Sequence, residues 1–528
     1  MLRMTRLFVV GSRYGFVLVA ALLVWLFIRE PFARFAHDHR RPDDVVVVTN
    51  TAINADAQQQ QQQLQNSPAV DSGGIASSNS EAIADGSDKP SLGQPPAQQQ
   101  LVEEPPRAKV YKPKPSAAPP IKDHFPWLTH SGKSPEVLEN NKPPFPHVPE
   151  KTPLLIGFTQ NWPLLLQCVS SYIAAGWPAG DIYVIENTGT FRANKQHQLS
   201  LQNPFFMNHT SLATLGVNII STPTLLSFSQ LQNFYLYVAQ QRSWEHFFWS
   251  HQDVIVFSDE DVKRKDRDHD WDRDPYATIY ERAVGLLRYL NGPEMPPWST
   301  HFFAYDLFTL VNRDAYLEVG GWDTHIPFKA ADCDMYLRLH WAGFWQPQSE
   351  AGLVYEVDAV LTDIGALFHI PGAHATFEED PVFAPLKTLK EDEEPDSAQL
   401  QQEIDMKPWV AKHGETWFHL VEVVERMAEA KENNTRYQLT RQAGGAGEPF
   451  YRDPEGFEVG IQALTTTGKA VFADKWGHRG CDLLDIGIDD KDAWRLMRDW
   501  DVSKSPGSEG GNWGKQWMTT PEEDRAAH

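Results

Sequence analysis

The distribution of hydrophobic and polar positions divides the chain into three parts. Residues 7–28 are almost wholly apolar, and as a helix rising about 1.5 Å per residue they are long enough to cross a bilayer. Residues 29–150 contain a glutamine run and a proline-rich segment, with too few apolar side chains to form a core. From residue 151 on, short apolar runs alternate with amphipathic segments, which is typical of an α/β fold.

Within the third part, the apolar runs predict buried strands and the amphipathic segments predict helices. The expected strands are residues 154–158, 181–186, 216–221, 247–256, 302–312 and 352–360. The expected helices are residues 163–175, 229–243 and 408–430. The first half therefore has the order of parallel β-α-β units, in which ligands bind at the carboxyl ends of the strands.

The apolar stretch at 7–28 is predicted to be an uncleaved signal anchor, because Arg29, Glu30 and Pro31 follow it directly and leave no small-residue cleavage site. Arginines flank it on both sides, so charge does not fix its orientation. Two glycosylation sequons, at Asn208 and Asn433, fit a lumenal body. We expect a short cytoplasmic tail (1–6), the transmembrane anchor (7–28) and a disordered stem (29–150).

Charge and cysteine content exclude a general nucleic-acid-binding protein and a disulfide-rich scaffold. A net charge of -23 and a pI near 5.2 leave no basic stripe for phosphates, so nucleic acid is not an expected partner. The three cysteines allow at most one disulfide, in which Cys481 pairs with either Cys168 or Cys333 in an oxidising lumen.

Acidic and amide side chains follow two of the predicted strands. Glu186 and Asn187 end the strand at 181–186, where they would meet a base or ribose, or form a plain turn. Asp253, beside His251, ends the apolar part of the strand at 247–256 and is a candidate for a metal or charged ligand. Residues 259–261, Asp-Glu-Asp, are an alternative for the same role.

Residues 319–339 combine a Gly-Gly-Trp-Asp turn with carboxylates at the start of a helix. Glycines allow a tight turn, and the helix dipole favours the charge of Asp332 and Asp334. Taken alone, Asp332 is a helix cap and Arg338 an i,i+4 partner of Asp334.

The element order up to residue 256 resembles the nucleotide-binding half of GT-A fold glycosyltransferases, in particular inverting enzymes similar to family 2. His251-Gln252-Asp253 stand where those enzymes have Asp-x-Asp, with His251 replacing the first carboxylate. The donor-binding residues that the resemblance implies are Glu186, Asn187, Asn233 and Asp253. The metal ligands that it implies are Asp253, His251 and His369, with His374 as an alternative to His369. The implied ion is Mn²⁺ rather than Mg²⁺, because imidazole suits Mn²⁺ better.

Residues 319–344 resemble the second motif of inverting GT-A enzymes, including the β-galactosyltransferases: G-G-[WF]-D, then E-D-x-D-[LM]-x-x-R-[LM], then G-[FY]. Asp332 stands at the position of the catalytic base and Asp334 at that of a sugar ligand. The acceptor- or sugar-binding residues that the resemblance implies are Trp322, Asp323 and Arg338. Ala331 replaces the glutamate of the motif.

We therefore predict a GT-A domain at 151–376, with a mostly parallel sheet flanked by helices, followed by an extension at 377–528 that is partly helical and partly disordered. The stem and glutamine run are similar to those of filamentous-fungal glycosyltransferase-like proteins. The predicted function is metal-dependent, inverting transfer of a sugar from a nucleotide-sugar to a hydroxyl of a glycan, glycoprotein or glycolipid.

The predicted location is the Golgi or another secretory-pathway membrane, with single-pass type II topology and a lumenal catalytic domain. The replacements at His251 and Ala331 favour an alternative, a catalytically inactive glycosyltransferase-like protein that binds or scaffolds in the lumen. A metal-dependent hydrolase is disfavoured because the histidines are scattered along the chain.

Overall fold

The computed structural model describes residues 121–190, 192–260, 276–378, 380, 407–433 and 442–499. The predicted anchor and most of the predicted stem lie outside these ranges. Within them, no helix combines the length and apolar character that a membrane span requires.

The last thirty residues assigned to the stem, 121–150, are folded against the body instead. They include α3 (Pro126–Ser131) and the short η1 (Glu139–Asn141). Phe125 is buried and stacks on Phe368 with ring centroids 5.9 Å apart. The few aromatic and aliphatic side chains of residues 121–150 are enough to hold this segment, because they pack into the hydrophobic core of the body.

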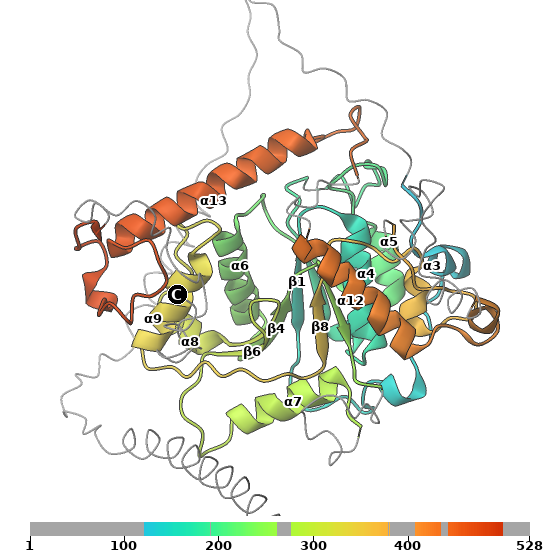
Figure 1. Ribbon diagram of the computed structural model, residues 1–528, viewed down its shortest axis with the longest axis horizontal. Coiled ribbons are helices and arrows are strands. Elements are labelled where there is room, and N and C mark those ends of the chain that lie inside the picture. Colours follow the sequence, from blue (N-terminus) through green and yellow to red (C-terminus); the bar gives the residue numbers. More distant parts are fainter. Residues whose placement is uncertain are drawn as a thin grey trace, which may run out of the picture. The chain divides into compact units, whose positions relative to one another are not determined.

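A six-stranded mixed sheet forms the centre of the protein and confirms the predicted α/β class (Figure 1). Its strands in spatial order are β3 (Asn218–Ser221), β2 (Ile182–Glu186), β1 (Leu154–Phe158), β4 (His246–Ser250), β7 (Phe308–Asn312) and β6 (Thr300–Ala304). The first four are parallel, and β7 runs antiparallel to both β4 and β6. The carboxyl ends of β1, β2 and β4 therefore meet at one edge.

Side-chain alternation along β1 divides the hydrophobic interior into two cores, one on each face of the sheet. Leu154 and Ile156 enter one core, whereas Leu155 enters the other. The first core is covered by α4 (Trp162–Ala174), α5 (His209–Leu215), α7 (Ile279–Leu290) and α12 (Trp417–Asn433). The second is covered by α6 (Phe228–Gln241), α8 (Arg313–Glu318), α9 (Ala331–Trp341) and α13 (Pro454–Trp476). The C-terminal extension thus contributes a helix to each core.

Local signals set the helix starts. A capping box formed by Ser227 and Gln230 opens α6, and another formed by Thr278 and Glu281 opens α7. The predicted helix at 408–430 is interrupted: residues 407–413 are helical, but Gly414 lies at φ +88°, outside the helical region, and residues 414–416 are not helical. The long helix accordingly begins later, at Trp417.

Two predicted strands are each split by a turn. The run at 247–256 becomes β4 and β5 (Val254–Phe257), and β5 leaves the main sheet to pair antiparallel with β8 (Leu353–Glu356). The run at 302–312 becomes the hairpin β6–β7, whose turn contains Asp306 at φ +55°. Both turns bring polar side chains to the ends of the strands.

Candidate functional site

A cavity of about 600 Å³ opens at the carboxyl ends of β1, β2 and β4. This edge is where open α/β sheets bind their ligands, and the volume is that of a small-molecule site. Its floor includes Gly157, Thr159, Asn187, His251 and Asp253. The loop before α6 and the first turns of α13 form its walls. Three predicted donor or metal residues, Asn187, His251 and Asp253, are therefore brought together.

Asn187 holds the cavity wall in place. Its Nδ2 donates to the Leu226 carbonyl oxygen at 2.9 Å, and its Oδ1 accepts from the Leu226 amide at 2.8 Å. Because both ends of the amide are used, the side chain fixes the loop that lines the cavity. The predicted contact with a ligand stays a prediction.

Glu186 does not line the cavity. Its carboxylate accepts from Ser221 Oγ at 2.8 Å and from Asn194 Nδ2 at 2.9 Å, and lies 3.1 Å from His209 Nε2. Burial opposes ionisation, but these donors outweigh it and hold the pKa of Glu186 below its usual value. The carboxylate thus organises the loop after β2, and its predicted nucleotide contact is not visible in this geometry.

Asp253 is already paired with a cation of the protein. Lys431 Nζ, near the end of α12, lies 2.9 Å from Asp253 Oδ2 and 3.0 Å from Glu356 Oε1. His251 Nδ1 lies 3.7 Å from Asp253 Oδ1. Burial would raise the pKa of Asp253, but Lys431 and His251 outweigh it and keep the pKa below normal. The carboxylate is therefore ionised.

His251 presents an aromatic and polar surface to the cavity. Its ring packs against Phe228 and Trp249. In the described part of the chain, its buried Nε2 has no hydrogen-bond partner. A buried imidazole nitrogen beside a cavity is suited to meet a polar ligand atom.

The predicted three-ligand metal set is not assembled. His369 Nδ1 lies 2.5 Å from the Glu415 carbonyl oxygen, just before α12, and its Nε2 lies 3.5 Å from Glu260. Lys431 contacts Asp253 near the other end of α12, roughly 21 Å away at about 1.5 Å per residue. With only His251 and Asp253 together, and an ammonium group on the carboxylate, these residues do not fit a resident divalent ion. Glu260, the alternative carboxylate from 259–261, lies with His369 at the distant end.

The Gly-Gly-Trp-Asp turn is held by Asn233 of α6. Asn233 Nδ2 donates to the Trp322 carbonyl oxygen at 2.8 Å, and its Oδ1 accepts from the Trp322 amide at 2.8 Å. Gly321 needs to be glycine, since its φ is +70° and a Cβ would lie 2.6 Å from Asn233 Oδ1. Trp322 is 3% exposed and packs against Phe228 and Tyr336. Asn233 and Trp322 thus build the turn, and neither lines the cavity.

Asp334 is enclosed by donors. It is 0% exposed, and its carboxylate accepts from Arg338 Nε at 2.8 Å and Trp476 Nε1 at 3.1 Å, with Lys475 Nζ at 2.6 Å. Lys475 also lies 2.7 Å from Asp323 Oδ2. Burial would raise the pKa of Asp323, but Lys475 outweighs it and lowers the pKa. The predicted sugar ligands Asp334, Asp323 and Arg338 therefore share one ion-pair network with α13.

Arg338 also ties this network to the turn. Its guanidinium donates to the carbonyl oxygens of Val319 and Gly321, each at 2.7 Å. Both bonds fix the backbone on which Trp322 and Asp323 stand.

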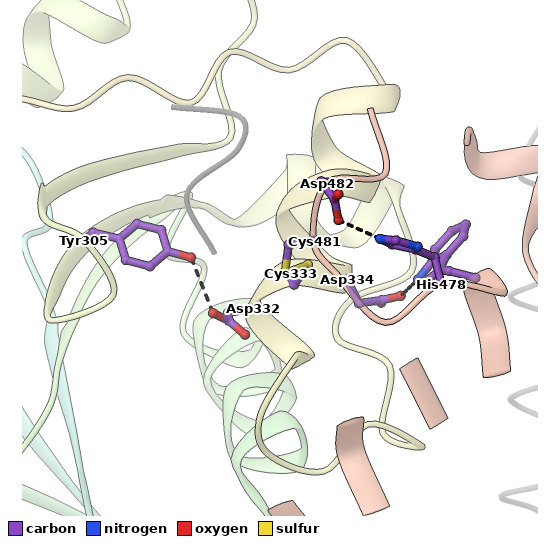
Figure 2. The surroundings of a disulfide bond; sticks show 8 residues. Tyr305, Asp332, Cys333, Asp334, His478, Cys481 and Asp482 are labelled. Carbon is purple, nitrogen blue, oxygen red and sulfur yellow. Dashed lines mark hydrogen bonds and ion pairs between the residues drawn. A yellow bond between two sulfur atoms is a disulfide. The ribbon is translucent and has the colours of Figure 1, made fainter. Parts of the chain in front are cut away.

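Asp332 faces away from that network, towards Tyr305 (Figure 2). The Tyr305 hydroxyl donates to Asp332 Oδ2 at 3.4 Å, and the Tyr336 hydroxyl donates to Asp306 Oδ1 at 2.7 Å. Burial raises the pKa of Asp332 above its usual value. Burial and the negative charge of Asp332 raise the pKa of Asp306 to about 6, while the charge of His251 opposes this. Asp332, Asp306 and His251 are thus electrostatically linked.

Asp306 was not predicted as a site residue, because it lies inside an apolar run that was predicted to be one strand. The one indication in the sequence was the carboxylate itself, because an unpaired charge in the middle of a buried strand is energetically costly.

The disulfide joins Cys333 of α9 to Cys481, with Cα atoms 5.9 Å apart (Figure 2). This is one of the two pairings left open by the sequence, and Cys168 is buried as a free thiol. The bond anchors the segment after α13 to α9, which follows the Gly-Gly-Trp-Asp turn.

The two sequons differ in their surroundings. Asn208 is partly exposed and caps α5, with its Oδ1 accepting from the Ser211 amide at 3.0 Å. Asn433 ends α12, and the rest of its sequon lies outside the described residues. Glycosylation at either position stays a prediction.

Comparison with known proteins gives distant structural likenesses only. No family model and no curated protein matches the sequence. The mannosyltransferase PcManGT from Pyrobaculum calidifontis, solved with GDP-Man and Mn²⁺, is 12% identical over 65% of this chain and 92% of that one, with a TM-score of 0.28. A cytidylyltransferase from Leptospira borgpetersenii serovar Hardjo-bovis is 10% identical over 51% and 99%, with a TM-score of 0.27. GalNAc-T7, solved with UDP, GalNAc and Mn²⁺, is 10% identical over 52% and 56%, also with a TM-score of 0.27.

Proposed function

We propose that this chain is a GT-A-type glycosyltransferase that binds a nucleotide-sugar in the cavity and transfers the sugar to a hydroxyl acceptor with inversion. The observation that carries the proposal is the cavity of about 600 Å³ at the carboxyl ends of β1, β2 and β4. Its volume fits a nucleoside diphosphate sugar, and its position is the usual one for nucleotides in open α/β sheets.

Charged groups of the cavity and of the first turn of α9 suit the two ends of such a reaction, although Asp332 in α9 does not itself line the cavity. His251 can donate to a diphosphate, with the Asp253–Lys431 pair beside it. Asp332 is the proposed base, which takes the proton of the acceptor hydroxyl as its oxygen attacks the anomeric carbon and the nucleoside diphosphate leaves. The raised pKa of Asp332 supports this role, because a base is more effective when its pKa is closer to the working pH.

The Asp334 network acts indirectly in this proposal. Because Asp334 is enclosed by Arg338, Lys475 and Trp476, it positions the start of α9 and so the carboxylate of Asp332. No step of the proposed reaction uses a metal ion, since His251 and Asp253 alone do not form a suitable site.

The setting of the reaction is likewise a proposal. The apolar stretch at 7–28 supports a type II anchor in the Golgi or another secretory-pathway membrane. The Cys333–Cys481 disulfide supports an oxidising lumen for the body of the protein. The acceptor in that compartment would be a glycan, glycoprotein or glycolipid.

The test separates binding from turnover. Binding of UDP, GDP and CDP is measured by calorimetry, and turnover of a nucleotide-sugar panel is followed by mass spectrometry, with and without Mn²⁺. We expect Asp332→Asn to lower turnover by about 100-fold or more while leaving nucleotide affinity unchanged. Asp314→Asn, an exposed carboxylate of α8, is the matched control.

Equal, measurable turnover by the wild type and Asp332→Asn would overturn the assignment of Asp332 as the base. Nucleotide binding without any turnover would instead identify the alternative, an inactive glycosyltransferase-like binding protein. The pairing of Asp253 with Lys431 is the observation that favours this alternative.

A further inference from the structure

Two histidines and a glutamate meet where the loop after η4 (Ile364–Phe368) contacts the segment leading into α12. We call His374, Glu415 and His419 the histidine–glutamate cluster. One ligand atom from each lies within 4.8 Å of those of the other two. His374 Nδ1 is 3.2 Å from Glu415 Oε2, and His419 Nε2 is 4.0 Å from Glu415 Oε1. The two imidazoles lie nearly parallel, with centroids 5.5 Å apart.

The histidine–glutamate cluster is remote from the cavity. Trp417, at the first turn of α12, donates its Nε1 hydrogen to the Ser258 carbonyl oxygen just beyond β5. Lys431, near the last turn, reaches Asp253 just before β5. From Trp417 to Lys431 the helix rises roughly 21 Å at about 1.5 Å per residue. None of the three cluster residues lines the cavity, so any ligand of the cluster is separate from the proposed donor site.

Glu415 is fixed with its carboxylate towards both imidazoles. Its side chain is 0% exposed, and its Oε2 accepts from the Ala375 amide at 2.6 Å. A buried carboxylate held by a backbone amide next to two imidazoles is a preorganised ligand, because its orientation does not depend on the ion.

The types of donor atom select the ion. Two imidazole nitrogens and one carboxylate oxygen are a set that Zn²⁺ uses with a water molecule as its fourth ligand. Mg²⁺ and Ca²⁺ prefer oxygen ligands throughout. Zinc–ligand distances of about 2.0–2.2 Å place tetrahedral donor atoms roughly 3.3 Å apart. Since the donor atoms here lie within 4.8 Å, side-chain movements of about an ångström complete the site.

We propose that His374, Glu415 and His419 bind one Zn²⁺ ion, which joins the loop after η4 to the start of α12. His374 comes from one segment, whereas Glu415 and His419 come from the other. The ion therefore crosslinks two segments whose nearest ligands, His374 and Glu415, are separated in sequence by residues 375–414. The three protein ligands leave the fourth coordination position to water, and the ion would lie outside the cavity.

The test measures metal binding directly on the full chain. Protein treated with chelator is given one equivalent of Zn²⁺, desalted and analysed by mass spectrometry for bound metal. We expect about one equivalent in the wild type and in His413→Ala, and a loss of at least tenfold in occupancy in His419→Ala. His413 is the matched control because it is exposed, lies close in sequence and uses its Nδ1 at the Trp409 carbonyl oxygen.

Two further readouts keep the proposal testable if one variant folds poorly. Co²⁺ added to the wild type should give visible absorption bands typical of four or five ligands, and His374→Asn should abolish them. Zinc at a hundredfold excess over its dissociation constant should raise the wild-type Tm by roughly 5 °C and leave that of His374→Asn unchanged. No retained zinc in the wild type, or equal retention in the wild type, His419→Ala and His374→Asn, would overturn the proposal.

Discussion

Replacing Lys475 by methionine tests whether the ion-pair network around Asp334 stabilises the fold. Lys475 is near the end of α13, and its ammonium group lies 2.6 Å from Asp334 and 2.7 Å from Asp323. Its side chain is 7% exposed. Methionine keeps most of the apolar stem but removes the charge, so the change isolates the electrostatic contribution.

The expected loss of stability follows from the carboxylate of Asp334, which stays buried when the charge of Lys475 is removed. Removing one partner of a buried ion pair costs about 3–5 kcal/mol, because the other charge stays buried without compensation. Asp334 keeps its bonds to Arg338 and Trp476, which places the expected loss near the lower end, about 3 kcal/mol. For a domain of this size, that corresponds to a decrease in Tm of roughly 4–6 °C.

The assay is urea unfolding followed by tryptophan fluorescence, with the free energy extrapolated to water. Lys469→Met, at an exposed position on the same helix, is the control and should change stability by less than about 1 kcal/mol. Lys475→Arg should recover part of the loss, because it restores the charge. If Lys475→Met and Lys469→Met unfold at the same urea concentration, the network does not stabilise the fold and the reasoning is refuted.

Three further predictions concern the disulfide, the hairpin turn and the glycine turn. The double replacement of Cys333 and Cys481 by serine should cost up to about 5 kcal/mol in urea unfolding, because the bond closes a loop of 148 residues; equal stability with and without reductant would contradict this. The pKa of Asp306 is about 6 in the folded protein, which is above its value in the unfolded chain. The wild type should therefore lose stability as the pH rises from about 4 to 6, by about 2 kcal/mol relative to Asp306→Asn. Parallel plots of Tm against pH for the two proteins would contradict this prediction. Asn233→Ala should destabilise by about 2 kcal/mol, since it leaves the amide and carbonyl of Trp322 without their side-chain partner; a change below 0.5 kcal/mol by the same assay would show that water replaces the amide.

The sequence predicts the elements that local patterns specify. The strands β1 and β2 and the helix α4 lie close to where the apolar runs place them, because each is a continuous buried segment. The two split strands could not be predicted in this way. In 247–256 and 302–312 the apolar run continues on both sides of the turn, so the change of partner strand is set by tertiary pairing.

The same limit applies to the site. Residue type and position predicted that Asn187, His251 and Asp253 would share one edge of the sheet, and they line one cavity. Arg338 was predicted as the i,i+4 partner of Asp334 and is found there, but the other partners of Asp253 and Asp334 were not predictable. Lys431 and Lys475 come from helices far along the chain, and no local pattern connects them to those carboxylates. His369 was expected beside Asp253, but the packing of α12 keeps the two residues apart, and this packing is likewise not visible in the local sequence.

The origin of Lys431 and Lys475 has a practical consequence for where the protein can be shortened. The domain predicted from the sequence ends at residue 376, so a protein shortened to that residue would be the natural first choice. It would lack both lysines, leaving Asp253 and Asp334 with reduced charge compensation, and it would expose an unpaired Cys333. Such a protein would also lack the wall of the cavity that α13 supplies. Loss of activity on truncation at 376 would therefore report damage to the site itself, and the smallest intact unit extends through Cys481.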